Sequence, residues 1–159
     1  MVPVRTYRTF WEHMKTLVPQ VNTVYLFATE KELTKYIAEV TTNDILLLAL
    51  IPSSDTKAAN IDNLTEVAPC VIFILRKTTD GDLSPEQLFE DREITQGVMN
   101  AVKQKMWDMA GDFDHQDANT RLMRRLILNG MHTDPEYNYL GCNGWSLAFG
   151  LDTKGIFNE

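Results

Sequence analysis

Three short segments of the chain are apolar at almost every position. Val24 to Ala28 reads VYLFA, Ile45 to Ile51 reads ILLLALI, and Val71 to Leu75 reads VIFIL. Runs of this length without alternation are typical of central strands that are covered on both faces, although a buried turn of helix has the same pattern. We therefore expect Ile45 to Ile51 and Val71 to Leu75 to form central strands, and Val24 to Ala28 to form a short strand.

Helix starts are marked by three capping boxes, in which a hydroxyl side chain and a Glu or Gln three residues later satisfy free backbone amides. The pairs are Thr9 with Glu12, Thr29 with Glu32, and Ser84 with Gln87. Apolar residues at helical spacing follow each pair, and Pro19 ends the first helix. These patterns predict three helices.

The longest predicted helix runs from Ser84 to about Ala110. Its expected apolar stripe consists of Ile94, Val98, Ala101, Val102 and Met109. Gly97 lies inside this helix and costs it about 1 kcal/mol relative to Ala. A further helix is predicted from about Ala118 to Leu128, because it precedes Asn129-Gly130, a common C-terminal cap.

The C-terminal part of the chain predicts a β-hairpin. Asn143-Gly144 supplies the two positive φ angles of a type I′ turn, and Asp134-Pro135 is expected to turn the chain before it. Apolar residues then alternate with polar or small ones from Trp145 to Asp152, which gives one core face and one solvent face. Together the segments predict an α+β fold, with a mixed or antiparallel sheet of about four to five strands and about two to four helices packed mainly on one face.

The segment between residues 52 and 68 is polar, yet it joins two of the most apolar runs in the chain. It is too long for a hairpin turn. A loop of this length is either functional or carries a short helix, and Ile61, Leu64 and Val67 permit one or two helical turns.

Composition adds few constraints. With 159 residues, of which 44% are hydrophobic and 23% charged, the chain fits a single domain over residues 1–159. The formal net charge of -7 argues against sequence-specific binding of nucleic acid, although a local basic patch is compatible with it. No segment approaches the roughly 20 apolar residues of a membrane span. We expect a cytoplasmic protein without a signal peptide, in which Cys70 and Cys142 are reduced core residues.

Motifs that carry chemistry are absent from the sequence, including phosphate-binding loops, nucleophile elbows, CxxC pairs and HExxH helices. His115 lies in the acidic turn DFDHQD, and His132 precedes Asp134 in MHTD. Either group has the residue types of a metal or acid/base site, but such residues are more often turn formers and helix caps. Asp114 or Asp117 capping the next helix explains the first cluster. We therefore predict no catalytic residue, metal site or cofactor.

Two further features are open to a structural role or an interaction role. Arg121, Arg124 and Arg125 place three cations near the end of a predicted helix. There they complement the helix dipole or form a docking patch for an acidic partner. Trp107 falls on the side of its helix opposite Ile94, so it is either covered by the chain that follows or exposed at an interface.

The order of predicted elements ends in a strand that carries Gly144, Trp145 and Phe149 in a Gly-Trp-x-x-x-Phe pattern. In outline, most of the chain resembles small bacteriophage or prophage tail proteins of the tail-terminator or tail-completion kind. This resemblance implies a structural subunit without an active site, which closes into a ring, usually hexameric, and joins the tail tube to the head. Its partners would be copies of itself and other tail proteins, and Ser53 to Glu66 would be an arm that contacts a neighbour.

Two other classes of protein remain open. The first is a small intracellular enzyme or ligand-binding domain that uses His115, His132 and Asp134, and the second is a monomeric regulatory or adaptor domain. The oligomeric mass distinguishes a ring from both of these, and bound metal would identify the enzyme.

Overall fold

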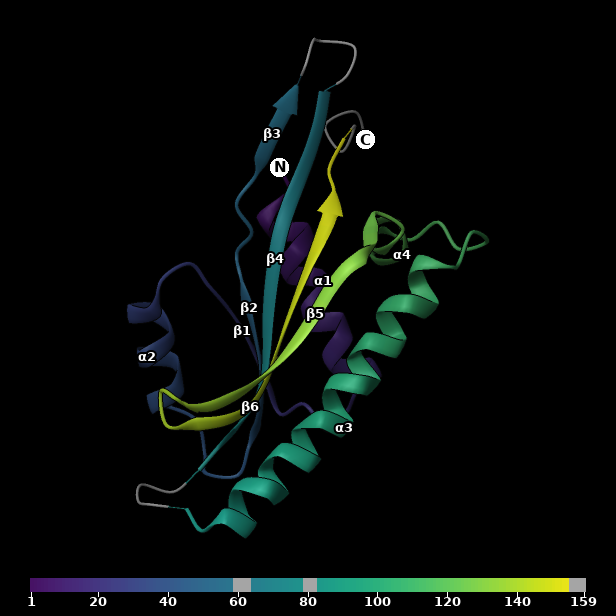
Figure 1. Cartoon of the computed structure of the whole chain (residues 1–159). Coiled ribbons are helices and arrows are strands. Elements are labelled where there is room, and N and C mark those ends of the chain that lie inside the picture. The colour runs from purple at the N-terminus through teal and green to yellow at the C-terminus, as the bar shows by residue number, and fades with distance from the viewer. Residues whose placement is uncertain (59–63, 79–82, 155–159) are drawn as a thin grey trace.

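Four helices and one mixed sheet make up the part of the chain that the computed structural model describes, residues 1–58, 64–78 and 83–154 (Figure 1). In chain order the elements are α1 (Val4–Leu17), β1 (Thr23–Phe27), α2 (Glu30–Ala38), β2 (Ile45–Leu50), β3 (Asp55–Ala58), β4 (Leu64–Lys77), α3 (Pro85–Ala110), α4 (Ala118–Met123), β5 (Leu126–Tyr139) and β6 (Cys142–Asp152). The strand order is β1-β2-β4-β6-β5, and β3 pairs with β4 outside this path. Because β1 and β2 are parallel and the other pairs antiparallel, the predicted α+β class with a mixed sheet is confirmed.

The centre of the sheet is buried on both faces. On β2, Leu47 and Ala49 join a large core with α1, α3 and α4, whereas Leu46 and Leu48 join a smaller core with α2. Successive residues of a strand point to opposite faces, so burial on both sides explains why β2 is apolar throughout. The prediction that Ile45 to Ile51 and Val71 to Leu75 form central strands is confirmed, and the helices lie mainly on one face as expected.

Two of the predicted capping boxes are present. The Thr29 side chain accepts the amide of Glu32 at the start of α2, and Ser84 accepts the amide of Gln87 at the start of α3. In each pair the second side chain accepts the backbone amide of the first residue. Both helices therefore begin where the sequence predicts.

The capping box predicted at Thr9 is wrong, because α1 begins at Val4 and Thr9 is one of its interior residues. The helix starts earlier because Tyr7 has an inward position in the large core, one turn before the predicted start. Glu12 is left free to accept a hydrogen bond of 2.8 Å from Arg8 on the helix surface.

The helix predicted over Ala118 to Leu128 is also wrong beyond its first half. It ends at Met123, and from Leu126 onward the backbone pairs with β6 as strand β5. Gly130 is not a helix cap. Its φ of 93° lies where the register of β5 against β6 shifts, so it forms part of a bulge. Pro135 does not turn the chain but lies within β5, which is compatible with proline because β5 is an edge strand.

The hairpin between β5 and β6 exists, but its turn is not at Asn143-Gly144. The turn residues are Leu140 and Gly141, with φ angles of 52° and 79°, between the paired residues Tyr139 and Cys142. Gly144 lies inside β6, where a Cβ atom would overlap the backbone carbonyl oxygen of Ile74 on β4. Close approach of the two strands, rather than turn geometry, therefore requires this glycine.

The polar segment between β2 and β4 forms a two-stranded ribbon instead of a helix. Asp55 to Ala58 pair with Leu64 to Val67 in antiparallel register. Leu64 and Val67, which were expected to permit helical turns, lie in β4, and Ile61 lies outside the described residues. This ribbon of β3 and β4 extends past the ends of the other strands and lies above the helices in Figure 1.

Candidate functional site

Polar contacts attach the first half of α3 to the sheet. Arg76 on β4 forms an ion pair of 2.9 Å with Asp91, and the indole nitrogen of Trp145 donates to the carbonyl oxygen of Arg92 at 2.9 Å. Burial raises the pKa of Asp91, and the Arg76 guanidinium opposes this shift. These contacts fix the rotation of α3, and with it the face that the helix leaves exposed.

The buried face of α3 differs from the predicted stripe. It consists of Asp91, Thr95, Val98, Met99, Val102 and Met106. Val98 and Val102 were predicted correctly, but Ile94 is 36% exposed because Asp91 and Thr95 take the inward positions of that turn. In the sequence, an aspartate and a threonine are expected at the surface. The buried stripe of α3 therefore could not be placed without knowing that Arg76 pairs with Asp91.

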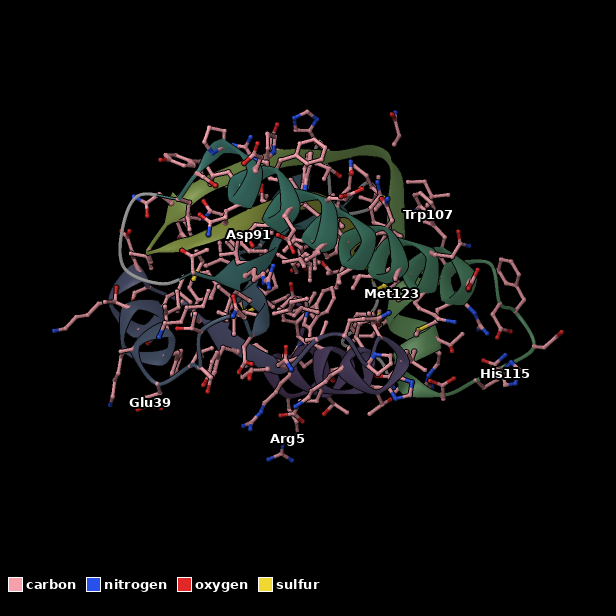
Figure 2. All side chains as sticks on the ribbon, turned by 90° about the horizontal axis from the view of Figure 1, so that it is seen from below. Arg5, Glu39, Asp91, Trp107, His115 and Met123 are labelled. Carbon is pink, nitrogen blue, oxygen red and sulfur yellow. The ribbon has the colours of Figure 1, made fainter. Side chains whose placement is uncertain are left out.

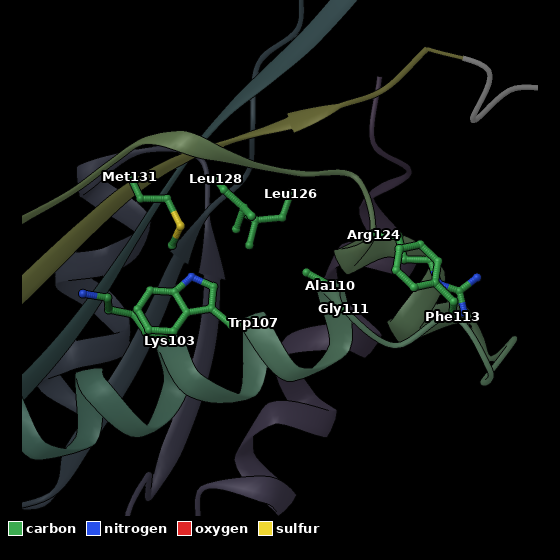
Figure 3. Close-up of a pocket in the computed structure, with 9 residues that line it drawn as sticks. All are labelled: Lys103, Trp107, Ala110, Gly111, Phe113, Arg124, Leu126, Leu128 and Met131. Carbon is green, nitrogen blue, oxygen red and sulfur yellow. The ribbon is translucent and has the colours of Figure 1, made fainter.

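An apolar groove lies between the C-terminal half of α3 and the edge strand β5 (Figure 3). Its volume is about 760 Å³, and it is lined by Lys103, Trp107, Ala110, Gly111, Phe113, Arg124, Leu126, Leu128 and Met131. Figure 3 shows Trp107 rising from α3 towards Leu128 and Met131 on β5. We call this feature the α3–β5 groove.

Large apolar side chains remain exposed in the α3–β5 groove. Trp107 is 42% exposed, Leu128 63% and Phe113 74%. The chain after Gly111 thus does not cover Trp107 fully, and β5 rather than that segment flanks the indole ring. Exposed apolar patches of this kind mark interaction surfaces in soluble proteins.

Cations lie against two of these aromatic rings. The ammonium nitrogen of Lys103 lies 5.4 Å from the Trp107 ring centroid, and the guanidinium carbon of Arg124 lies 5.6 Å from that of Phe113. Both distances fall within the range of cation–π contacts. The groove is therefore apolar inside and positive at its rim.

Arg124 also holds the loop between α3 and α4. Its guanidinium donates to the carbonyl oxygen of Asp112 at 2.6 Å, to the carbonyl of His115 and to the Gln116 side chain at 3.2 Å. Arg125 donates to the carbonyl oxygen of Lys154 at 2.7 Å. Two of the three arginines that form a cluster in the sequence are thus bound to their own chain.

The histidine predicted as a candidate in this loop forms a carboxylate pair. The Nδ1 atom of His115 lies 2.6 Å from Oδ2 of Asp112, whose other oxygen accepts the backbone amides of Asp114 and His115. These contacts, led by the His115 amide, lower the pKa of the Asp112 carboxyl. Asp117 caps α4 by accepting the amides of Asn119 and Thr120, which confirms one of the two caps predicted there.

A second, smaller hollow of about 430 Å³ adjoins this loop. It is lined by His13, Met109, Asp112, His115, Asp117, Asn119 and Thr120. The structure thereby brings residues of α1 and of the α3–α4 loop to one place. His132 and Asp134 form a separate pair on β5, 3.0 Å apart and exposed, so the predicted candidates His115 and His132 each have their own acidic partner.

In the part of the chain that the structure describes, the cysteines and the acidic side chains form no larger cluster. Over residues 1–58, 64–78 and 83–154, no group of three or more His, Cys, Asp or Glu side chains is arranged to hold a metal ion. Cys70 and Cys142 are buried as free thiols, as expected for core residues. Burial raises the pKa of Cys70 to about 12 and that of Cys142 to about 11.

Phe113 and Leu128 are groove residues that sequence reasoning did not find. Phe113 was indicated only by its position as a single aromatic residue within the acidic turn DFDHQD. Leu128 was assigned to a helix, and its exposure became evident only once β5 was recognised as an edge strand.

Comparison with known proteins gives no identification, because no family model, curated protein or solved structure matches the chain. Among the helices of the described residues, none has the length and apolar character to cross a membrane. A function can therefore be proposed only from the α3–β5 groove and from the ribbon that β3 and β4 form.

Proposed function

We propose that this protein is a structural subunit of a phage-like tail, of the ring-forming tail-terminator, tail-completion or minor tail type. It would act in the host cytoplasm and in the virion, with copies of itself and other tail proteins as partners. The observation that carries this proposal is the β3–β4 ribbon, which projects from the sheet (Figure 1).

Within the described residues, β3 pairs with β4 alone and not with the other strands of the sheet. Residues 67 to 77 of β4 pair with β6, whereas the part of β4 before Val67 pairs with β3. Isolated two-stranded ribbons are at best marginally stable in water, so a projecting one is well suited to gain its remaining contacts from a neighbouring molecule. The outer edge of β3, which pairs with no strand other than β4 among the described residues, carries backbone groups that a further strand can bind.

The base of the ribbon is held firmly, as a contacting arm requires. Glu66 is buried, its carboxylate binds the Ser54 hydroxyl and the amino group of Met1, and its carbonyl oxygen accepts the Thr153 amide at 2.8 Å. These contacts lower the pKa of the Glu66 carboxyl, with the amino group as the largest cause. The arm predicted over Ser53 to Glu66 therefore begins at a fixed point and extends outward from it.

The alternative is a small enzyme or ligand-binding domain, and the short contact between His115 and Asp112 favours it. However, Asp112 and Asp117 already accept backbone amides, so these carboxylates perform the structural role expected of turn and cap residues. Metal analysis of protein purified without added metal tests this alternative. Stoichiometric zinc, iron or manganese would support it against the tail proposal.

The tail proposal is tested by light scattering at micromolar concentration on the intact chain and on a chain with a shortened ribbon. Residues 56–65 are replaced by a short Gly-Ser turn, so that Ser54 and Glu66 keep their contacts at the base. We expect the intact chain to form an oligomer of defined mass and the shortened chain to form a smaller one.

Circular dichroism and thermal unfolding of the shortened chain control for loss of the fold. If the intact chain stays monomeric even with its neighbouring tail proteins present, the proposed function is wrong. If shortening leaves the oligomer unchanged, only the assignment of the ribbon as the arm is wrong.

A further inference from the structure

The α3–β5 groove carries two positive charges that its own chain does not neutralise. In the part of the chain that the structure describes, neither Lys103 nor Arg124 forms an ion pair with a carboxylate. The oxygens that Arg124 binds belong to backbone carbonyls and to the Gln116 amide, which are uncharged groups. Both cations are therefore available to an anionic group from outside the chain.

The acidic residues nearest to the groove in sequence are engaged elsewhere. The carboxylate of Asp108 on α3 accepts a hydrogen bond of 2.8 Å from Gln104. The carboxylate of Asp112 contacts the His115 ring and accepts backbone amides of the α3–α4 loop. Among the described residues, no acidic one lines the groove. On a chain with a net charge of -7, a groove with two cations and no carboxylate in its lining is complementary to an anionic partner.

A bulge in β5 positions the apolar side chains of the groove. The register of β5 against β6 shifts between Ile127 and His132, so the residues between them leave the regular ladder. Leu128 and Met131 are three positions apart and would point to opposite faces of a regular strand, yet both line the groove beside Trp107 (Figure 3). Bulges re-aim side chains in this way and are frequent next to functional sites.

The same bulge makes this part of β5 a poor template for an added strand. Strand addition needs a regular row of backbone groups along the edge, and a bulge interrupts that row. Gly130 lies within the bulge with a φ of 93°, which is far from the extended backbone of a strand. The groove is therefore suited to bind side chains of a partner rather than to pair with its backbone.

The two cations lie at opposite ends of the groove, with apolar side chains between them (Figure 3). Lys103 and Gly111 are eight positions apart on α3, which is about 12 Å at a rise of about 1.5 Å per residue. Phe113, whose ring Arg124 covers, follows two residues later. A small amphipathic anion has one charged end and meets only one of these cations. An occupant that meets both carries acidic groups on both sides of an apolar centre.

We propose that the α3–β5 groove binds a segment of a partner protein in which acidic residues flank an apolar centre on both sides. The apolar side chains of the segment cover Trp107 and Leu128, which are 42% and 63% exposed. One acidic side chain pairs with Lys103 and the other with Arg124. The guanidinium of Arg124 has five N–H donors, and its three bonds to its own chain leave donors for this carboxylate.

This groove contact goes beyond the proposed function and does not rest on it. The ribbon extends past the ends of the other strands, whereas the groove lies between α3 and β5 (Figure 1). The partner is defined by the chemistry of its segment, and the ribbon has no part in binding it. The two contacts can therefore fail or hold separately.

Fluorescence anisotropy with labelled synthetic peptides tests the groove contact on the full chain. The probe is Glu-Glu-Leu-Phe-Leu-Glu-Glu, in which an extended backbone places the inner acidic residues about 13 Å apart. One control peptide has Lys in place of every Glu, and the other has Ser in place of the three apolar residues. We expect the probe to bind about tenfold more tightly than either control, because only the probe matches both the charge and the apolar lining of the groove.

Charge reversal at one end of the groove tests the assigned ion pair. We expect Lys103→Glu to weaken binding of the probe about tenfold or more, because attraction is replaced by repulsion. Two mixed peptides, each with Glu at one end and Lys at the other, cover both orientations of a bound segment. One of them should bind Lys103→Glu more tightly than the probe does, which a general loss of stability would not produce.

Two further variants complete this experiment. Leu128→Ser removes an exposed apolar side chain and is expected to weaken probe binding about tenfold without lowering the unfolding temperature. Lys35→Glu makes the matched charge change on α2 and is expected to leave probe binding unchanged. Figure 2 shows that α2, which precedes the labelled residue Glu39, lies far from Trp107.

Several results would overturn the groove contact. These are a probe that does not bind at high micromolar concentration, a lysine peptide that binds as tightly as the probe, or a Lys103→Glu chain that behaves like Lys35→Glu. If dodecanoate displaces the labelled probe as well as the unlabelled probe does, the occupant is a small amphipathic anion and the proposed partner is wrong.

Two measurements separate the groove contact from self-association and from the proposed function. If Lys103→Glu lowers the mass of an oligomer formed by the chain alone, a second copy occupies the groove and the proposed partner is again wrong. Shortening the ribbon over residues 56–65 should leave the affinity for the probe unchanged. A loss of oligomer without a loss of probe binding then concerns the ribbon only, and the opposite result concerns the groove only.

Discussion

Two glycines in this protein have opposite relations to their surroundings. Gly144 lies in β6 opposite Leu75, where the backbone of β4 leaves no room for a side chain. Gly97 lies on the exposed face of α3, where a Cβ atom would be in open space. From the sequence, Gly144 was assigned to a hairpin turn and Gly97 to the interior of a helix, but only Gly144 is required by the fold of the single chain.

For Gly144→Ala we expect a clear loss of stability. The new methyl group would overlap the carbonyl oxygen of Ile74, which belongs to the backbone and cannot rotate away as a side chain would. The strands must separate locally, and overpacking of this kind lowers the free energy of unfolding by about 2 kcal/mol or more. Urea denaturation followed by tryptophan fluorescence measures the change, and a loss below about 0.5 kcal/mol would contradict the predicted clash.

For Gly97→Ala we expect the opposite sign. Alanine has the higher helix propensity, and no neighbouring atom opposes its methyl group, so the free energy of unfolding should rise by about 0.5–1 kcal/mol. The same denaturation assay, at a concentration at which both chains are monomeric, provides the comparison with Gly144→Ala. A destabilised Gly97→Ala chain would mean that the helix surface is more crowded than the structure shows.

At the scale of elements, helix caps give the most direct link between sequence and stability. Asp117 caps α4 through two backbone amides and the Thr120 hydroxyl, and the hydroxyl contact is the largest cause of its lowered pKa. We expect Asp117→Ala to lower the free energy of unfolding by about 1 kcal/mol near neutral pH. Asp117→Asn should keep most of this stability, because asparagine also caps helices.

The pH dependence of the Asp117 cap has a defined sign. The pKa of Asp117 is lower in the folded chain than in the unfolded one, so its contribution is fully present above the unfolded value of about 4. It is lost as the pH falls through the lower folded value. The stability difference between the original chain and Asp117→Asn should therefore shrink on acidification, and unfolding curves recorded from neutral pH downward measure it. A difference that grows on acidification would contradict the assigned sign.

The success of sequence reasoning varied between elements for physical reasons. β2 and β4 could be predicted because burial on both faces leaves a continuous apolar run, and α2 and α3 because their caps are local. β5 was missed because Leu122 and Leu126 have helical spacing although the helix ends between them. Its bulge and its place at the sheet edge break the alternation that identifies a strand.

The candidate site was harder to predict than the fold. The α3–β5 groove joins residues 103 to 131 only because β5 returns beside α3, a pairing that the sequence pattern did not contain. Trp107 was the one groove aromatic singled out beforehand, since its position opposite the core stripe depends on α3 alone. That His13 and His115 line one hollow likewise depends on how α1 packs near α4.

At the scale of the whole molecule, two cores share one sheet. Cys70 belongs to the large core with α1 and α3, and Cys142 belongs to the smaller core with α2. The strands that carry them pair directly over residues 67 to 77 of β4. Loss of packing on either face therefore destabilises β4 and β6, which contribute side chains to both cores. We expect the two cores to unfold together.

Thiol labelling of the single-cysteine chains Cys70→Ser and Cys142→Ser measures this cooperation. Both thiols are buried, and burial raises their pKa to about 12 for Cys70 and about 11 for Cys142, so native thiols should react with a disulfide reagent only when the chain opens. If opening is global, both chains label at one slow rate once their unfolding free energies are matched with urea, and both label fast in full denaturant. If Cys142 labels much faster than Cys70 under native conditions, the small core opens by itself. In that case α2 and the β5–β6 turn would be a separate cooperative unit on a sheet that stays formed.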